Sequence, residues 1–204
     1  MAANRRPNPR AAFLNIPYDA EFVDLFLAYI AGLAAHGLTP RATLEVPGGA
    51  RRLDRIIELI QSCRYSFHDL SRVELDASVP PAPRFNMPFE LGLAVACDRL
   101  VPNHHTWFVM ESENRRLLKS LSDLGGTDVY IHDGNPQGVF REIGNALVRG
   151  ARQPSVQDLQ VIHESLRTVM PEILNRNAAK SVYEARSFKQ LVVEAAALAN
   201  NRMR

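Results

Sequence analysis

An alternation of short apolar runs with longer amphipathic runs is the feature that most restricts the fold of this chain. Between residues 11 and 150 the alternation repeats five times, from AAFLNIP at its start to PQGVFREIGNALVRG at its end. Short apolar runs are typical of buried strands, and apolar residues spaced three or four apart are typical of helices that cover a sheet. Strands that alternate with helices indicate a parallel sheet with helices on both faces. Right-handed crossovers then predict an α/β fold with a doubly wound five-stranded parallel sheet, in the flavodoxin-like order 2-1-3-4-5.

The expected elements divide the chain into one domain and an extension. Strands are expected at residues 11–17, 39–46, 65–71, 105–111 and 128–133, and helices at 20–37, 50–63, 88–100, 114–124 and 136–150. Two further runs, over residues 155–175 and 179–200, carry one apolar stripe each. With 204 residues the chain is long enough for one complete core and an addition to it. We therefore expect an α/β domain over residues 11–150 and, over residues 155–200, two extra C-terminal helices that pack on the domain or across a dimer.

Charge and composition exclude several classes of function. The net charge of +2 is too small to indicate a nucleic-acid partner, and the basic stretch NRRPNPR is interpreted as a flexible tail. No apolar run approaches the roughly 20 residues of a membrane span, and the start of the chain has no apolar segment typical of a secretory signal. Cys63 and Cys97 lie in apolar segments, like buried thiols of a reducing compartment, and no Cys or His spacing is typical of a metal site. These features predict a cytoplasmic protein without a structural metal.

The sheet topology predicts where a ligand would bind. In a doubly wound sheet, ligands lie outside the carboxyl ends of the strands, where the strand order reverses. The loop after the third expected strand has about fifteen residues, in a fold whose connections usually have two to six, and it leads into the helix that carries Glu90. The candidate ligand contacts are polar or aromatic residues at these strand ends: Tyr18, Asp19, Asp69, Ser71, Arg72, Arg84 and Asn86.

Glu90 has two interpretations that the sequence leaves open. Pro88 suits the first position of a helix, so Glu90 would be the third helical residue. From that position a carboxylate bonds back to the start of the helix and stabilises it. The same position would also aim Glu90 into the ligand cleft, where the positive end of the helix dipole would keep the carboxylate ionised. Helix capping and catalysis are therefore both open for this residue.

The segment RFNMPFELGLAVA resembles a motif shared by nucleoside 2-deoxyribosyltransferases and TIR-like nucleotide-binding domains. The motif is N-x-x-x-E-L-G-x-A, and its matched positions are Asn86, Glu90, Leu91, Gly92 and Ala94. The preceding RLDRIIELIQSCRYSFHDLS is similar to the helix and strand that lead to the motif in those families, with Asp69 at the strand end. The two pieces span roughly residues 51–97, and the plan of five strands extends a looser resemblance over residues 11–150.

The resemblance implies chemistry at an N-glycosidic bond. In deoxyribosyltransferases the glutamate of the motif attacks the anomeric carbon, and in TIR-like NAD hydrolases it holds the ribose hydroxyls and promotes the loss of nicotinamide. A carboxylate suits both roles, because the transition state resembles an oxocarbenium cation. Glu90 would be the catalytic residue and NAD, or another nucleoside or nucleotide, the substrate, with no cofactor. The acid that orients the base in the transferases has no clear match, and Asp69 or Asp76 would serve.

The other candidates take supporting roles under this hypothesis. Asn86 and Asp69 would bind the sugar or position Glu90, Arg72 and Arg84 would bind phosphates, and Tyr18 would border the base. Residues 71–86 would form a lid that excludes water, or a surface loop held by its own ion pairs. A second hypothesis is a non-catalytic nucleotide-sensing or protein-interaction module on the same fold. Because both families tend to assemble, a homo-oligomer is expected, with neither nucleic acid nor membrane as a partner.

Overall fold

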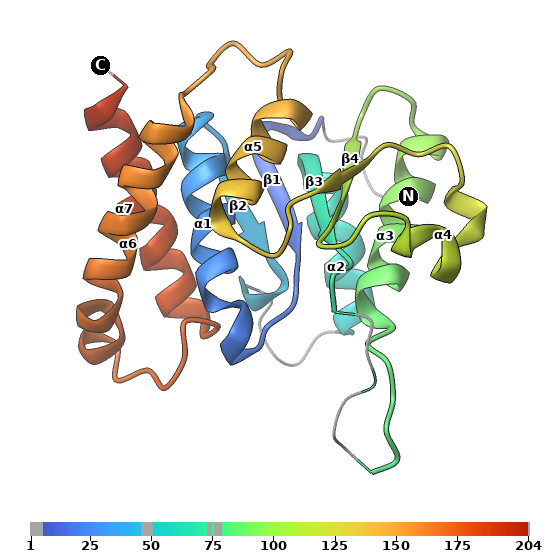
Figure 1. The fold of residues 1–204 in the computed structure, drawn as a ribbon, viewed down its shortest axis with the longest axis horizontal. Coiled ribbons are helices and arrows are strands. Elements are labelled where there is room, and N and C mark those ends of the chain that lie inside the picture. The colour runs from blue at the N-terminus through green and yellow to red at the C-terminus, as the bar shows by residue number, and fades with distance from the viewer. Residues whose placement is uncertain (1–5, 46–50, 73–74, 76–78, 204) are drawn as a thin grey trace.

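Five parallel strands form one sheet at the centre of the molecule (Figure 1). The computed structural model describes residues 6–45, 51–72, 75 and 79–203. The strands are β1 (Asn8–Asn15), β2 (Thr39–Ala42), β3 (Cys63–Asp69), β4 (Thr106–Glu111) and β5 (Val129–Ile131). Their order in the sheet is β2-β1-β3-β4-β5, and each neighbouring pair is parallel. The predicted α/β fold with the flavodoxin-like order 2-1-3-4-5 is therefore confirmed.

Helices cover both faces of this sheet. They are α1 (Val23–Ala35), α2 (Arg52–Ser62), α3 (Asn86–Leu100), the short α4 (Arg116–Ser120) and α5 (Pro136–Ala146). Helices α1 and α5 pack together on one face, and α2 and α3 pack together on the other (Figure 1). Ala12 and Leu14 of β1 belong to the core around α1, whereas Ala11 and Phe13 belong to the core around α2. Consecutive side chains of a strand point to opposite faces, so a strand covered on both faces has a continuous apolar sequence.

The start of one strand and the end of another differ from the positions that the sequence predicts. β1 begins at Asn8, so Asn8–Arg10 extend the sheet and the interpretation of this stretch as part of a flexible tail was wrong. β2 ends at Ala42, because the next three residues form a turn of 3-10 helix. In that turn Glu45 Oε1 accepts hydrogen bonds from Arg41 Nε at 2.9 Å and from the Ala42 amide at 3.1 Å. A local side-chain contact thus ends the strand four residues earlier than the apolar pattern does.

The two C-terminal helices, α6 (Val156–Arg176) and α7 (Ala185–Arg202), pack on α1. Their apolar stripes, including Phe188, Leu191 and Ala195, are buried in the same core as α1 and the sheet. Helix α1 therefore lies between the sheet and the C-terminal pair (Figure 1). This explains why α1 is apolar on all sides, since a helix buried all round needs no polar face. The stripes are thus covered within one chain.

Leu191→Ala should lower the free energy of unfolding by about 2–5 kcal/mol, the cost of removing a large aliphatic side chain from a packed core. Leu191 is completely buried between α7 and α1. Denaturant unfolding followed by circular dichroism would measure the loss. Val193→Ala, on the exposed side of the same helix, is the matched control and should change stability by less than about 0.5 kcal/mol. Similar small losses for both variants would mean that α7 is not part of the folding unit.

Candidate functional site

Helix α3 begins two residues before the predicted start, and this changes the position of Glu90. Asn86 is the first helical residue and Phe85 is the N-cap, so Glu90 is the fifth residue of the helix. The helix start has no side-chain cap, and its first backbone bond runs from the Phe89 amide to the Phe85 carbonyl at 3.0 Å. Pro88 is tolerated at the third position because that amide has no partner within a helix either. The capping interpretation of Glu90 is therefore wrong.

The Glu90 side chain is largely buried and has no hydrogen-bond or ion-pair partner among the described residues. The residue is only 6% exposed, and no residue in the described part of the chain donates a hydrogen bond to it. Burial raises the pKa of Glu90 to about 7, and the positive charge of Arg52 opposes this rise. The expectation that the helix dipole keeps Glu90 fully ionised was wrong, because at the fifth position desolvation outweighs the dipole. Buried polar groups usually have partners, so a carboxyl group with a raised pKa and no partner among the described residues is a candidate for a binding or catalytic function.

The charge of Arg52 acts on Glu90, and Glu90 in turn acts on Tyr18, which contacts Thr43. Tyr18 follows β1, and its hydroxyl lies 3.2 Å from Thr43 Oγ1, just after β2. Burial raises the pKa of Tyr18, the charge of Glu90 adds to the rise, and Arg52 lowers it. The site thus draws on the loops after β1 and β2 and on the first turns of α2 and α3. It lies at the carboxyl ends of the strands, where the sheet order reverses between β1 and β3.

Asn15 ties β1 to the first turn of α3, a role that the sequence did not reveal. Its amide nitrogen donates to the Met87 carbonyl at 2.8 Å and lies 2.9 Å from His68 Nδ1. A buried chain of hydrogen bonds continues from His68 Nε2 to Ser66 Oγ and on to His105 Nε2, at 2.8 and 2.7 Å. Burial lowers the pKa of His68 to about 3, so the ring is neutral. An amide at the end of an apolar strand was the signal that could have identified Asn15.

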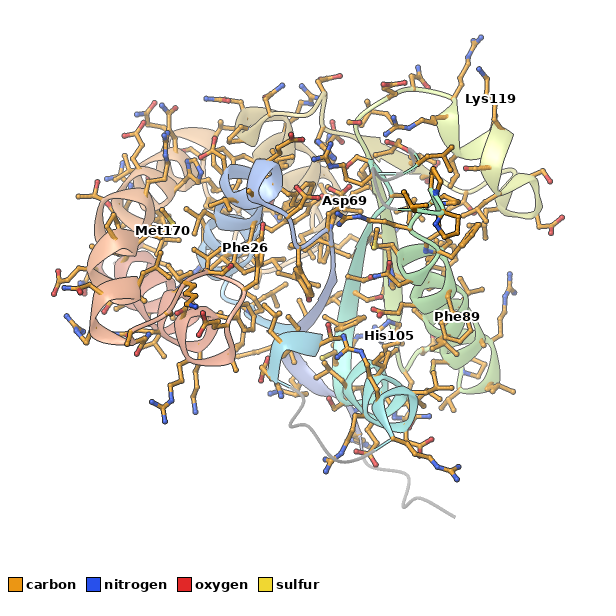
Figure 2. The ribbon with its side chains drawn as sticks, turned by 90° about the horizontal axis from the view of Figure 1, so that it is seen from below. Phe26, Asp69, Phe89, His105, Lys119 and Met170 are labelled. Atoms are coloured by element: carbon orange, nitrogen blue, oxygen red, sulfur yellow. The ribbon has the colours of Figure 1, made fainter. Side chains whose placement is uncertain are left out.

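Asp69 points away from Glu90, toward α1. It is completely buried and accepts hydrogen bonds from the Tyr29 hydroxyl at 2.7 Å, from the Ser71 amide at 2.9 Å and from the Ser71 hydroxyl. His132 Nε2 lies 3.1 Å from the same carboxylate. Burial by itself raises the pKa of Asp69, but His132 and Ser71 outweigh it and the pKa falls below its ordinary value. In Figure 2 Asp69 lies beside α1 near the middle of the molecule, whereas Phe89 lies beside α3.

The structure therefore does not bring Asp69 and Glu90 together. Helices α1 and α3 cover opposite faces of the sheet, and each carboxylate faces its own helix layer. Ser71 is buried and serves Asp69, and its carbonyl accepts a hydrogen bond from Arg116 at 2.6 Å. Arg116 also pairs with Glu111, a buried residue that the sequence did not single out. These contacts lock the carboxyl ends of β3 and β4 together.

The predicted phosphate ligands Arg72 and Arg84 are paired with carboxylates. Arg72 lies 3.1 Å from Asp19 and also pairs with Glu21, and Arg84 lies 3.2 Å from Asp19. Asp19 in addition accepts the Phe22 amide at 3.0 Å. The two ends of the loop over residues 71–86 are thus bound to the segment after β1.

The remaining loop residues contribute less to the site. Leu75 pairs with Pro83 in an antiparallel bridge within the loop. Glu74 and Asp76, expected as parts of a lid, lie outside the described residues. Asn86 is exposed at the start of α3, one turn before Glu90. Of the predicted site residues, Asp19, Arg72 and Arg84 form one ion-pair cluster, and Tyr18 and Glu90 influence each other only through their charges.

The raised pKa of Glu90 predicts that this residue destabilises the fold at neutral pH and above. A carboxyl group whose folded pKa is near 7, against an ordinary value of 4.5, binds its proton more tightly in the folded state. Its effect is absent below about pH 4.5, grows as the pH rises through 7, and then levels off. Glu90→Gln should therefore raise the free energy of unfolding at pH 8 by about 1–3 kcal/mol. Denaturant unfolding at pH 5 and pH 8 measures this, and a variant less stable than wild type at pH 8 would show that Glu90 has a stabilising partner.

Comparison with known proteins adds no assignment to this geometry. No protein-family model matches the chain, and no curated protein is similar to it. Within the described ranges, no group of His, Cys, Asp and Glu side chains is arranged to hold a metal ion. None of the helices described is both long and apolar enough to cross a membrane. The functional assignment therefore depends on the site around Glu90.

Proposed function

We propose that this protein binds a nucleotide or nucleoside and cleaves its N-glycosidic bond, with NAD⁺ as the substrate that fits best. The observation that carries the proposal is the largely buried side chain of Glu90, which has no partner among the described residues and comes from α3 near the switch point of the sheet. Carboxyl groups with perturbed pKa values are typical of catalytic sites. The resemblance of the segment around Glu90 to deoxyribosyltransferases and TIR-like domains supports the same chemistry.

Glu90 would stabilise the cation that forms when the bond breaks. The bond between the anomeric carbon and the base nitrogen breaks, and its electron pair leaves with the base, which for NAD⁺ is released as neutral nicotinamide. The ribosyl group is left as an oxocarbenium-like cation, and the Glu90 carboxylate is the anion beside it. Water then adds to the anomeric carbon and gives up one proton to the solvent. A positively charged substrate would also lower the pKa of Glu90 and favour its ionised form before the reaction.

The other side chains have roles that follow from their positions. Tyr18 follows β1, its ring lies 5.3 Å from the ring of Tyr183 between centroids, and it would border the base or the ribose. Asn86 lies one helical turn before Glu90 and would meet the sugar at the entrance of the site. Asp19, Arg72 and Arg84 would hold the long loop in place over the site through their ion pairs. Asp69 and Ser71 would act only through the structure, because they bond to each other, and Asp69 also contacts Tyr29 and His132.

A second candidate is a non-catalytic nucleotide-sensing or protein-interaction module. The observation that favours it is the exposure of Phe85 and Phe89, at 70% and 55%, at the start of α3 beside the site. Exposed aromatic residues are enriched in protein interfaces. A homo-oligomer that covers these rings is compatible with either candidate function.

Release of free base from candidate substrates distinguishes the two functions. Purified protein at micromolar concentration would be incubated with NAD⁺, with purine and pyrimidine nucleosides and with 2′-deoxynucleosides, and the free bases quantified by chromatography. We expect nicotinamide to accumulate together with ADP-ribose in equal amounts. Binding of NAD⁺ without release of any base would instead support the sensing module. The absence of both binding and release, for all of these compounds, would contradict the proposal.

A further inference from the structure

A cavity of about 470 Å³ lies at the amino ends of the strands, the edge of the sheet opposite to the carboxyl ends. Its walls come from the first residues of β1, β2 and β3, from the ends of α1 and α7, and from the segment after α5. All of these wall residues belong to the part of the chain that the structure describes. Binding sites for small molecules usually have volumes of roughly 300–1,000 Å³, so this cavity is large enough for one.

Two arginines line the cavity, and none of its described wall residues is an aspartate or a glutamate. Arg10 belongs to β1, and Arg152 follows α5. The Arg152 guanidinium lies against Gly37, since a methyl group added to Gly37 would be 3.8 Å from Arg152 Nη1. Within the described ranges, neither guanidinium group has an ion pair or a hydrogen bond. The cavity therefore carries two positive charges that no neighbouring carboxylate compensates.

These arginines are not used to cap α1 or α5, the helices that end beside them. Cationic side chains near the end of a helix often bind its last carbonyl groups. At the end of α1, carbonyl groups accept the amides of Gly37 and Leu38, both at 2.9 Å, and contact the ring of His36. After α5, Gln153 Nε2 donates to three carbonyl groups at 3.0 and 3.1 Å. The guanidinium groups of Arg10 and Arg152 thus remain available to an anion.

His36 is a neutral part of the cavity wall. Its Nδ1 lies 2.8 Å from the Gly32 carbonyl, so this nitrogen carries the proton. Burial lowers the pKa of His36, and the charge of Arg152 adds to the fall. Its Nε2 is buried and has no hydrogen-bond partner among the described residues. Buried polar atoms without a partner are rare in folded proteins, so this nitrogen is a second indication that a bound molecule completes the cavity.

We infer that this cavity binds a small organic dianion, a phosphate monoester or a dicarboxylate, whose charges meet Arg10 and Arg152 and whose apolar part lies against Leu38, Leu147 and Tyr65. Guanidinium groups form paired hydrogen bonds with phosphates and with carboxylates. Two positive charges without an acid beside them favour a ligand with two negative charges over a ligand with one. The site lies at the other edge of the sheet from α3, and it does not depend on the proposed reaction.

Calorimetric titration at pH 8 with three ring compounds of similar size tests this inference. Phenyl phosphate and phthalate carry two negative charges at this pH, whereas phenyl sulfate has nearly the shape of phenyl phosphate and carries one. We expect one dianion to bind per chain, at least about 10-fold more tightly than phenyl sulfate, and less tightly as salt is added. The dianion that binds more tightly identifies the acidic group. Binding of neither dianion at millimolar concentration, or equal affinity for phenyl sulfate, would overturn the inference.

Variants of the wall locate the bound dianion. Arg10→Gln and Arg152→Gln should each weaken its binding at least about 10-fold, the usual effect of removing a charge-assisted contact. Both variants should keep the wild-type unfolding transition, because neither guanidinium group has a partner among the described residues. Arg149→Gln is the matched control and should keep the wild-type affinity, since Arg149 is exposed and outside the cavity only three residues before Arg152.

Glu90→Gln distinguishes this cavity from the site proposed for cleavage. The variant should bind the dianion as wild type does, whether or not the wild-type protein releases any base from a nucleotide. Affinity that is unchanged in both Arg10→Gln and Arg152→Gln, or lost in Glu90→Gln, would show that the dianion binds elsewhere and would contradict the inference.

Discussion

Glu90→Gln should lower kcat for nicotinamide release by about 10²–10⁴-fold, the range typical of removing a catalytic acid, base or charge that acts in the transition state. Glutamine keeps the size and the hydrogen-bonding atoms of the side chain but cannot carry the negative charge that faces the developing cation. The variant should remain folded, because the carboxylate has no partner among the described residues and does not cap α3. One preparation of the variant is used for two measurements. The rate of nicotinamide release gives kcat, and the unfolding transition shows that the protein is folded.

The pH dependence of the reaction provides an internal control for this variant. The pKa of Glu90 in the free protein is about 7, so kcat/KM for NAD⁺ should rise with pH and level off above that value. Glu58→Gln, which removes an exposed carboxylate on α2, should leave both the rate and its pH profile unchanged. A Glu90→Gln variant that keeps more than about a tenth of the wild-type kcat would contradict a catalytic role.

Asp69→Ala should lower the free energy of unfolding by about 3–5 kcal/mol, the usual cost of removing one member of a buried charged network. The substitution leaves the Tyr29 hydroxyl and both Ser71 donors without their acceptor, and it removes the carboxylate that lies 3.1 Å from His132 Nε2. All of these groups are in the interior, where water cannot replace the lost carboxylate. Denaturant unfolding at pH 7 measures the loss.

Asp133→Asn is the matched control for Asp69→Ala. Asp133 is an exposed aspartate that pairs with Arg141 at 3.0 Å and has a left-handed backbone conformation that asparagine also tolerates, so loss of its charge should cost less than about 1 kcal/mol. Because the folded pKa of Asp69 is below its ordinary value of 3.8, its contribution is present above that pH and is lost as the pH falls below it. The difference in the free energy of unfolding between wild type and Asp69→Ala should therefore become smaller at acid pH. A difference in the free energy of unfolding below about 1 kcal/mol at pH 7 would mean that the network around Asp69 contributes little to stability.

The two substitutions separate functions that the sequence could not separate. In the sequence, Asp69 follows one apolar run and Glu90 lies near the start of another, so both were candidates for the carboxyl end of the sheet. Their environments differ, since Asp69 has several donors and Glu90 has none among the described residues. We expect Asp69→Ala to affect mainly stability and Glu90→Gln to affect mainly catalysis. Opposite outcomes would exchange the roles of the two residues.

The sequence by itself determined the sheet and most of its helices. Apolar periodicity is a local property, and each strand and helix of the domain carries it within its own residues. The right-handed crossover rule then leaves few arrangements, and the order 2-1-3-4-5 is one of them. The sequence was less accurate where single side chains set the element ends. Glu45 ends β2, and α3 starts at Asn86, two residues before the predicted start, with Pro88 tolerated at its third position.

Only the tertiary structure decided what the polar residues do. Asp19 meets Arg72 and Arg84 from segments more than 50 residues away in the chain, and Tyr29 and His132 reach Asp69 from α1 and from the end of β5. The protonation of Glu90 depends on how much water the surrounding helices exclude, and no pattern within residues 81–96 contains that information. Partners and solvation are properties of the folded surroundings of a side chain, so the sequence could name the candidate residues but could not decide which of them are free to bind a ligand.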